Sequence, residues 1–434
     1  MPEKFQTPRG FKDILPLEHN FFTLIKKVAR HRFRQAGFLR ISTSMLENLE
    51  VFARGIGADT DIVSKEMFSF ESRSGKKMVL KPEGTAGVVR AFIEHGMQSW
   101  AQPVQLYYFE PHFRYERPQK GRFRQFWQCC AEVLGARDPL VDAQIIILAW
   151  KIIKDLKIAD SVSLQINSLG SPADRAKFID ELHNFFEPRS RALCDDCRSR
   201  LQKNPLRILD CKNEDCQILV KTAPKLSNFL NDDSRKFYEQ VLQFLTDLKV
   251  PFVENENLVR GLDYYCDTVF EFQTNSDGAQ NAICGGGRYD GLCEILGGPA
   301  TPAVGFAFGV ERVIEEMKKK NISPPEKDFT QIFVACLGDV AQSECLKILS
   351  DLQDLGIHVR GAFGKSSMKS QLKTADRLGA QFCLILGDVE IREKNVILRN
   401  MENGEQENIP LDEVQKVIAE KFPPQKRDFY NLEI

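Results

Sequence analysis

The sequence predicts an α+β fold, with a large antiparallel sheet and helices in one domain and a small α/β domain after it. Two features indicate the sheet. Stretches rich in aromatic and β-branched residues are bounded by turn-forming residues, and helical patterns lie between only some of them. The second domain is indicated by a charged, proline-containing break at 318–328, after which strand-like and helix-like stretches alternate.

The first predicted element is a helix. Phe21, Ile25, Ala29 and Phe33 recur at helical spacing, and Gly37 follows them as a stop signal. A strand is expected near Ile41.

Four later stretches are predicted strands of one sheet, and two others are predicted helices. The strands are 104–116, 124–135, 267–274 and 303–310, and the helices are 141–157 and 234–249. The helix at 141–157 is apolar almost all round, so we expect it to be buried.

The break in periodicity sets the domain boundaries. We place the first domain at 1–322, with an insertion at about 170–235, a linker at 323–328 and the second domain at 329–434. The sequence has no internal repeat and no low-complexity segment.

Composition is that of an ordinary globular protein. With 434 residues, 43% of them hydrophobic and 27% charged, the chain can bury a sizeable core. A net charge of −1 argues against bulk attraction to nucleic acid, but it allows a local basic strip. The absence of a long apolar run or signal-peptide core predicts no membrane span and a cytoplasmic location. Twelve irregularly spaced cysteines favour reduced thiols or a metal site over disulfides.

A local basic strip does occur at residues 113–128, FRYERPQKGRFRQFWQ. We expect Arg114 and Glu116 on one strand, Phe126 and Gln128 on the next, and the basic residues largely in the loop between them. Arginine beside an aromatic ring suits a nucleotide, because guanidinium pairs with phosphate while the ring stacks on a base. A solvated basic hairpin tip is the alternative that charge alone leaves open.

The same stretch resembles motif 2 of the class II aminoacyl-tRNA synthetases, and its form resembles the histidyl-tRNA synthetase family in particular. Four more motifs stand in the family's order. GFLRISTSMLE (37–47) resembles motif 1, VGFAFGVER (304–312) resembles motif 3, and LVRGLDYY (258–265) and GGRYDGL (286–292) resemble the two histidine-specific signatures. The resemblance covers nearly the whole chain and implies a class II antiparallel-sheet catalytic core followed by an anticodon-binding domain.

The resemblance implies a histidine–tRNA ligase. In this family the carboxylate of histidine attacks the α-phosphate of ATP, pyrophosphate leaves, and histidine passes from the adenylate to the 3′ end of tRNA-His. Because negative charge develops in the transition state, positioning and cations, Mg²⁺ among them, should carry most of the rate. A homodimer is also implied. Ser44 stands where motif 1 usually has proline, which leaves the detail of the dimer interface open.

The resemblance assigns residues to ATP and to catalysis. Arg114 would contact the α-phosphate, and Arg122 and Arg312 the outer phosphates. Phe126 would stack on adenine beside Glu116. Arg260 would reach both the histidine carboxylate and the α-phosphate. The catalytic set implied is Arg114, Arg260 and Arg312.

The resemblance also assigns a histidine pocket, in which Glu132 and Tyr265 read the imidazole while Glu83, Thr85 and Gln128 hold the α-amino group. Tyr289, with Gly286 and Gly287, would close the pocket. The implied histidine-binding set is Glu83, Gly84, Thr85, Arg114, Gln128, Glu132, Arg260, Tyr264, Tyr265 and Tyr289. From the residues alone, Glu132 is only a polar residue in an apolar strand, and tyrosines such as Tyr264 and Tyr265 are more often core aromatics.

Two surfaces are candidates for tRNA contact. One is the loop of the basic strip, with Gln119, Lys120 and Arg124. The other is a helical stripe at four-residue spacing in the second domain, formed by Lys365, Lys369, Lys373 and Arg377. A solvated helix face is the alternative for this stripe.

Four cysteines have the spacing C-x2-C-x13-C-x4-C. They are Cys194, Cys197, Cys211 and Cys216, and the pattern is compatible with tetrahedral zinc. Four reduced thiols in an insertion domain are the alternative. The resemblance does not make zinc necessary for catalysis.

A second function class competes with the ligase. The regulatory subunit of ATP phosphoribosyltransferase resembles the synthetase core but usually lacks the C-terminal domain and parts of the catalytic set. This chain keeps Arg114, Arg260, Arg312 and that domain, so the sequence favours the enzyme. A pseudo-synthetase joined to a kinase is disfavoured because the chain has no kinase motifs.

Overall fold

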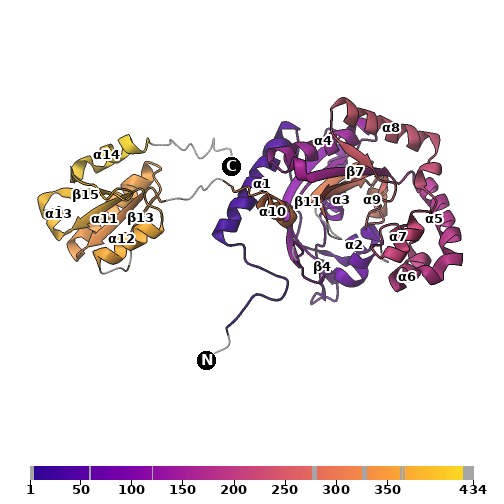
Figure 1. Ribbon diagram of the computed structural model, residues 1–434, viewed down its shortest axis with the longest axis horizontal. Helices are drawn as coiled ribbons and strands as arrows, with labels where there is room; N and C mark the ends of the chain where they lie inside the picture. Colours follow the sequence, from indigo (N-terminus) through magenta and orange to yellow (C-terminus); the bar gives the residue numbers. More distant parts are fainter. Residues whose placement is uncertain are drawn as a thin grey trace. The chain divides into compact units, whose positions relative to one another are not determined.

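A computed structural model describes residues 4–57, 60–119, 121–275, 281–324, 330–361, 364 and 367–423. The chain divides into two compact units, Met1–Pro324 and Pro325–Ile434. Each unit has its own sheet and helices (Figure 1). Within the described residues, no helix is long and apolar enough to span a membrane.

The first unit is built on an eight-stranded sheet in the order β1-β5-β6-β11-β10-β9-β7-β8. Its strands are β1 (Leu39–Arg40), β5 (Val104–Phe113), β6 (Gln125–Leu134), β11 (Ala303–Gly309), β10 (Ala282–Arg288), β9 (Cys266–Thr274), β7 (Val162–Ser168) and β8 (Phe252–Glu254). The six central strands pair antiparallel, and only the edge pairs β1–β5 and β7–β8 are parallel. The predicted antiparallel α+β core is confirmed.

One face of this sheet is covered by α1 (Pro16–Gln35), α4 (Pro139–Asp155), α8 (Asp232–Asp247) and α10 (Val310–Lys319), whose apolar residues form one core with the strands. The long predicted helices are confirmed, including the burial of α4, which begins at an Asp138 N-cap and Pro139. α1 ends where predicted, because Gly37 takes a left-handed φ of 84°.

The other face carries α2 (Leu49–Ile56), α3 (Thr85–Glu94) and α9 (Leu292–Ile295), which pack into a second core. Beside α2 lies a small sheet of β2 (Leu46–Asn48), β4 (Lys77–Leu80) and β3 (Ser69–Glu71). The π-helix η1 (Ile62–Glu66) follows α2, and short 3-10 turns occur at η2 (Met97–Ser99) and η3 (Ala159–Ser161).

In the described segment between β7 and α8, every regular element is a helix. It contains α5 (Pro172–Phe186), η4 (Glu187–Ala192), α6 (Asp195–Lys203), η5 (Pro205–Ile208), α7 (Glu214–Val220) and η6 (Leu226–Asn228). A capping box between Ser171 and Asp174 starts α5. In Figure 1, α5, α6 and α7 gather at one side of the unit, outside the sheet.

One placement in the sequence analysis was wrong. Arg114 and Glu116 were expected on a strand, but β5 ends at Phe113. The backbone N–H of Arg114 still donates to Arg124 O at 2.9 Å, whereas the N–H of Tyr115 donates to Glu66 O at 2.6 Å. The chain therefore leaves the sheet to follow η1, and both side chains belong to the loop.

The second unit is a small α/β domain with a five-stranded sheet in the order β13-β12-β14-β15-β16. Its elements are β12 (Ile332–Leu337), α11 (Asp339–Asp354), β13 (Val359–Gly361), α12 (Met368–Arg377), β14 (Phe382–Gly387), α13 (Asp388–Glu393), β15 (Asn395–Asn400), β16 (Gln406–Pro410), η7 (Leu411–Glu413) and α14 (Val414–Lys421). The predicted strand-helix alternation holds through β14. The antiparallel pair β15–β16 extends it.

Candidate active site

A pocket lies on the sheet face that turns away from α1 and α4, and strand alternation explains its lining. In β6, Cys129 and Ala131 point into the core beneath the helices, whereas Gln128 and Glu132 point to the pocket. Glu271 of β9 reaches the same pocket.

All the residues predicted to bind histidine or ATP line this pocket, with the exception of Gly84. They are Glu83, Thr85, Arg114, Glu116, Arg122, Phe126, Gln128, Glu132, Arg260, Tyr264, Tyr265, Tyr289 and Arg312. Gly84 is the N-cap residue of α3 and stands between two lining residues without being one.

Two strand glycines make room for charged side chains. A Cβ atom at Gly305 would lie 1.8 Å from Glu132 Oε2, and one at Gly285 would lie 2.5 Å from Arg260 Nη1. Any side chain at either position would therefore displace a carboxylate or a guanidinium from the pocket.

The glycines expected to close the pocket were placed one step too far along β10. Gly285 lines the pocket, and Gly286 and Gly287 do not. A Cβ atom at Gly286 would meet the Phe270 ring at 2.8 Å, because strand alternation turns this residue toward the opposite core.

Three arginines converge at one end of the pocket. Arg114 Nε donates to Pro82 O at 2.9 Å, and its guanidinium lies 5.3 Å from the centroid of the Phe126 ring. Burial lowers the pKa of Arg312, and the charges of Arg122 and Arg114 lower it further. Because the three guanidinium groups repel one another, this end of the pocket is suited to bind a polyanion such as a triphosphate.

Glu116 holds part of this cationic end. Its buried carboxylate forms an ion pair with Arg122 and lies 3.8 Å from Arg114 Nη1. One carboxylate thus orients two arginines and leaves most of their charge available to a ligand.

The other end of the pocket is acidic and aromatic. Glu132 is 1% exposed, and it accepts hydrogen bonds from Tyr289 Oη at 2.6 Å, Thr85 Oγ1 at 2.9 Å and Tyr108 Oη at 3.0 Å. Burial raises the pKa of Glu132 to about 7, although the hydrogen bonds from Tyr289 and Thr85 oppose the rise. A carboxyl poised between its two forms suits a ligand that itself carries a titratable N–H.

Aromatic rings wall this acidic end. Tyr264 lies 4.7 Å from Tyr265 and 5.6 Å from Tyr289, measured between ring centroids, and all three rings are buried. Glu83 accepts hydrogen bonds from the backbone N–H groups of Thr85 and Ala86 at 2.7 and 2.9 Å, which fixes it at the start of α3.

Arg260 stands between the two ends. Its guanidinium forms an ion pair with Glu271 and lies 5.4 Å from the Tyr265 ring centroid. Burial lowers the pKa of Arg260, but Glu271 and Tyr265 together raise it by more, so that the net shift is upward. The buried Nε donor of Arg260 has no hydrogen-bond partner among the described residues, so a donor remains for a ligand.

Gln119 and Arg124 of the basic loop, which are predicted to contact tRNA, do not line the pocket. Gln119 and Arg122 form a bridge at the tip of the basic loop, with N···O distances of 3.2 and 2.9 Å. The Arg124 guanidinium lies 3.7 Å from the Tyr115 ring centroid and bonds to Arg9 O, so it stabilises the loop base. Lys120 lies outside the described residues.

The basic stripe of the second unit lies on α12. Lys369, Lys373 and Arg377 are exposed, whereas Gln371 and Ala375 of the same helix are buried. Lys365 lies outside the described residues. The stripe therefore faces solvent, as both readings of the sequence require.

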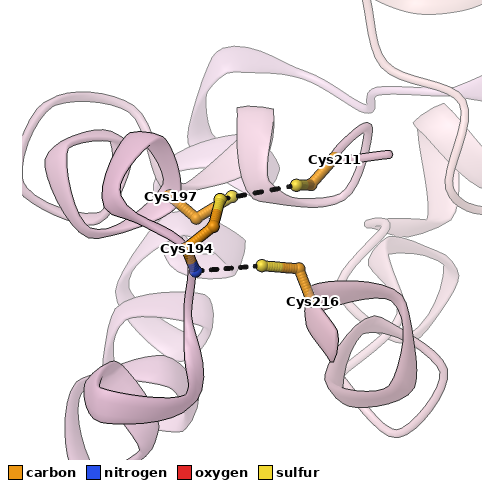
Figure 2. Close-up of side chains that lie close together, drawn as sticks. All are labelled: Cys194, Cys197, Cys211 and Cys216. Carbon is orange, nitrogen blue, oxygen red and sulfur yellow. Dashed lines mark hydrogen bonds between the residues drawn. The ribbon is translucent and has the colours of Figure 1, made fainter. Parts of the chain in front are cut away.

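The four spaced cysteines come together away from the pocket. Their sulfur atoms lie within 4.8 Å of one another, and Figure 2 shows the four side chains gathered at one point. All twelve cysteines lie among the described residues, and none of them forms a disulfide. None of the four lines the pocket.

Sequence reasoning missed Tyr108 and Glu271. Tyr108 donates to Glu132, and Glu271 pairs with Arg260. The available signal for Glu271 was its charge between two phenylalanines of a buried strand. Tyr108 carried no such signal, because a tyrosine in an aromatic strand also suits a core.

The chain is similar to known proteins over most of its length. The family model for histidyl-tRNA synthetase matches residues 10–313, and the anticodon binding domain model matches residues 331–421. The chain is 43% identical over 410 residues to the histidine–tRNA ligase of Dehalococcoides mccartyi, covering 94% of this chain and 98% of that protein.

Two further proteins show the same likeness. The histidine–tRNA ligase of Geobacillus thermodenitrificans is 43% identical, with 96% of this chain and 98% of that protein covered. The crystal structure of the apo histidyl-tRNA synthetase from S. aureus superposes with a TM-score of 0.79 at 36% identity, covering 95% of this chain and 99% of that one.

Proposed function

The chain belongs to the histidyl-tRNA synthetase family and is a histidine–tRNA ligase, and from that premise we propose how its pocket divides the work. The first unit carries out adenylation and transfer, and the second unit contacts the anticodon of tRNA-His. One observation carries this proposal. Arg114, Arg122 and Arg312 converge at one end of the pocket, and the buried carboxyl of Glu132 lies at the other end.

ATP occupies the cationic end in this proposal. Arg114 binds the α-phosphate, Arg122 and Arg312 bind the outer phosphates, and Phe126 stacks on adenine beside Glu116. The lowered pKa of Arg312 supports this, because an anionic ligand would relieve the repulsion among the three guanidinium groups.

Histidine occupies the acidic and aromatic end. Glu132 pairs with an imidazole N–H, with Tyr265 and Tyr264 beside the ring. Glu83, Thr85 and Gln128 hold the α-amino group, and Tyr289 closes the pocket. The buried position of Glu132 supports imidazole recognition, because three hydroxyl donors fix the carboxyl in place and use only part of its acceptor capacity, which leaves room for a further N–H.

Arg260 stabilises the charge that develops between the attacking carboxylate and the α-phosphate. Its contacts with Tyr265 on one side and Glu271 on the other support a position between the substrates. In the first step a bond forms between the histidine carboxylate oxygen and the α-phosphorus, and the bond to pyrophosphate breaks. The ribose hydroxyl of tRNA then displaces AMP.

Mg²⁺ would neutralise the phosphates when ATP binds. The carboxylates at this end, Glu116 and Glu271, are each paired with an arginine, so we expect the ion to be held mainly by the phosphates. A zinc ion on the four cysteines would take no direct part in this chemistry, because none of them lines the pocket.

The assembly and the tRNA contacts complete the proposal. We expect a cytoplasmic homodimer, with Gln119, Lys120 and Arg124 near the acceptor end of tRNA and the α12 stripe near the anticodon. A regulatory, non-catalytic role is disfavoured, because the arginine set implied for catalysis lines one pocket.

Histidine-dependent exchange of labelled pyrophosphate into ATP tests this proposal. We expect exchange with the parent protein, strong loss with Arg312→Ala, and near-parent exchange with Arg137→Ala. Arg137 is a suitable control because it pairs with Asp267 and Asp290 outside the pocket. Absence of exchange in the folded parent, or exchange that does not depend on histidine, would contradict the proposal.

A further inference from the structure

The four-cysteine cluster has the geometry of a metal site. Cys194 is the N-cap residue of α6 and Cys197 lies in its first turn, while Cys211 precedes α7 and Cys216 lies within it. Figure 2 shows the four side chains pointing toward one another from these separate elements. Residues 22 positions apart in the chain have thus been brought together at one point.

The sulfur spacing suits a shared ion better than a disulfide. Four thiolates about 2.3 Å from a tetrahedral zinc ion lie roughly 3.8 Å from each other, whereas a disulfide needs about 2.05 Å. Cys194 Sγ and Cys211 Sγ lie 3.9 Å apart, and no pair of ligand atoms in the cluster exceeds 4.8 Å.

The surroundings of the sulfurs fit thiolate ligands. The backbone N–H of Cys194 donates to Cys216 Sγ at 3.3 Å, and that of Asn213 donates to Cys211 Sγ at 3.4 Å. Bonds of this kind orient ligands and stabilise their negative charge. Cys197, Cys211 and Cys216 are at most 5% exposed, so the ion would be shielded from water.

The clustered segment contacts the loop that carries Arg260 and Tyr265. Directly after α6, Asn204 Nδ2 donates to Asp263 Oδ1 at 3.0 Å. Arg207 pairs with Asp61, just before η1, at 2.6 Å. Both contacts come from the loop between Cys197 and Cys211, whose ends a metal ion would close.

We propose that Cys194, Cys197, Cys211 and Cys216 bind one zinc ion, and that the ion holds the Asn204–Arg207 turn against the loop of residues 258–265. Ion binding closes a 13-residue loop in a helical segment that lies outside the sheet, so its free energy stabilises that segment. The effect on histidine binding rests on the proposed function, whereas the metal site does not.

Metal analysis tests the site first. Protein purified without chelators or metal-affinity resin should contain about one zinc per chain, and a thiol-specific mercurial should release it. The Cys211→Ser/Cys216→Ser variant should lose most of the zinc, whereas Cys293→Ser, which changes a buried cysteine elsewhere in the first unit, should retain it. Less than about half an equivalent in the parent would overturn the site.

Cobalt gives a readout that does not depend on how well a variant folds. Parent protein exchanged with Co²⁺ should show the charge-transfer absorption of thiolate ligands and the visible bands of tetrahedral cobalt. Bands of octahedral cobalt without thiolate absorption would contradict a four-cysteine site.

The coupling to the histidine loop has its own test. Asn204→Ala removes one hydrogen bond, so the histidine KM should rise about fivefold while the ATP KM and the zinc content stay unchanged. Gln202→Ala is the matched control, because Gln202 is exposed on the same turn. Equal histidine KM values for the two variants would overturn the coupling alone, and histidine-independent exchange in the parent would instead point to failure of the proposed function.

Discussion

The two ends of the pocket use opposite electrostatic strategies. At the cationic end, Arg114, Arg122 and Arg312 lie close enough to disturb one another, and Glu116 offsets only part of their charge. At the acidic end, three hydroxyl donors hold Glu132 in place. The first end keeps unused attraction for a ligand, whereas the second keeps a fully specified geometry.

This difference fits the ligand that we propose for each end. Triphosphate presents high charge in a flexible chain, so gathered arginines bind it with little need for exact shape. Imidazole is small and nearly neutral, and it must be distinguished from other side chains by paired polar contacts. Binding strength is therefore concentrated at one end and discrimination at the other.

Replacement of Arg260, the residue between the two ends, should have the largest effect. Arg260→Ala should slow adenylate formation on the order of 10²- to 10³-fold, because one preorganised donor is worth about 3 to 4 kcal/mol in the transition state. Arg260→Lys should recover only part of the rate, since an ammonium group cannot span two partners as a planar fork does. Pre-steady-state adenylate formation is the measurement.

A purely structural role for Arg260 predicts another pattern, because its ion pair with Glu271 could simply steady the fold. Thermal midpoints measured on the same preparations separate the two roles. A variant that melts early yet forms adenylate within threefold of the parent would remove Arg260 from catalysis.

The next effect concerns stability and pH. The folded pKa of Glu132 is about 7, above its usual 4.5, so the native state keeps a proton that the unfolded chain releases. This contribution to stability is fully present below about pH 4.5 and is lost as pH rises through 7. Relative to Glu132→Gln, the parent should lose on the order of 3 kcal/mol in free energy of unfolding between pH 4.5 and 8.

Chemical denaturation of both proteins across this pH range measures the difference. The Glu132→Gln variant carries a neutral group of similar shape at every pH, so it serves as the reference for the parent protein. If the free energies of unfolding of the two proteins changed in parallel with pH, Glu132 would have an ordinary pKa. The electrostatic contrast between the two ends of the pocket would then not hold at the acidic end.

The same substitution should separate the substrates. Glu132→Gln should raise the histidine KM about 10- to 100-fold, because a hydrogen bond to a charged group is exchanged for an amide of partly wrong polarity. The ATP KM should stay within about twofold, since the cationic end is unchanged. Steady-state exchange kinetics with each substrate varied in turn would show this, and an unchanged histidine KM would place Glu132 outside recognition.

The smallest effect on the pocket should come from the second unit. Lys369→Ala/Lys373→Ala should leave pyrophosphate exchange unchanged and lower tRNA aminoacylation several-fold, because the two phosphate contacts that we propose for these lysines would be removed. Lys347→Ala, on exposed α11, is the control. Equal losses in both reactions would mean that the α12 stripe acts through the fold.

Much of this architecture could be predicted from local patterns. Aromatic and β-branched runs marked β5, β6, β9 and β11, and helical periodicity marked α1, α4 and α8. β10 was missed as a strand because its sequence, AICGGGR, has the composition of a turn. Its place in the sheet depends on the side chains of neighbouring strands, which single-sequence patterns do not report.

The site residues were predicted from motifs, and the residues that were missed lie outside those motifs. Glu132 and Arg260 stood in recognisable surroundings, but their partners Tyr108 and Glu271 come from strands without any signature. The pKa of Glu132 was also beyond sequence reasoning, because it depends on burial created by three separate elements.

Gly285 and Gly305 restrict how substitutions can change the size of this pocket. Glycine has the smallest side chain, so every replacement at these two positions takes space from Arg260 or Glu132 and none can add any. A bulkier amino acid could be admitted only by trimming the walls, such as Tyr264. Substitutions at Gly285 and Gly305 should therefore reduce activity, and they should not enlarge the range of substrates toward bulkier amino acids.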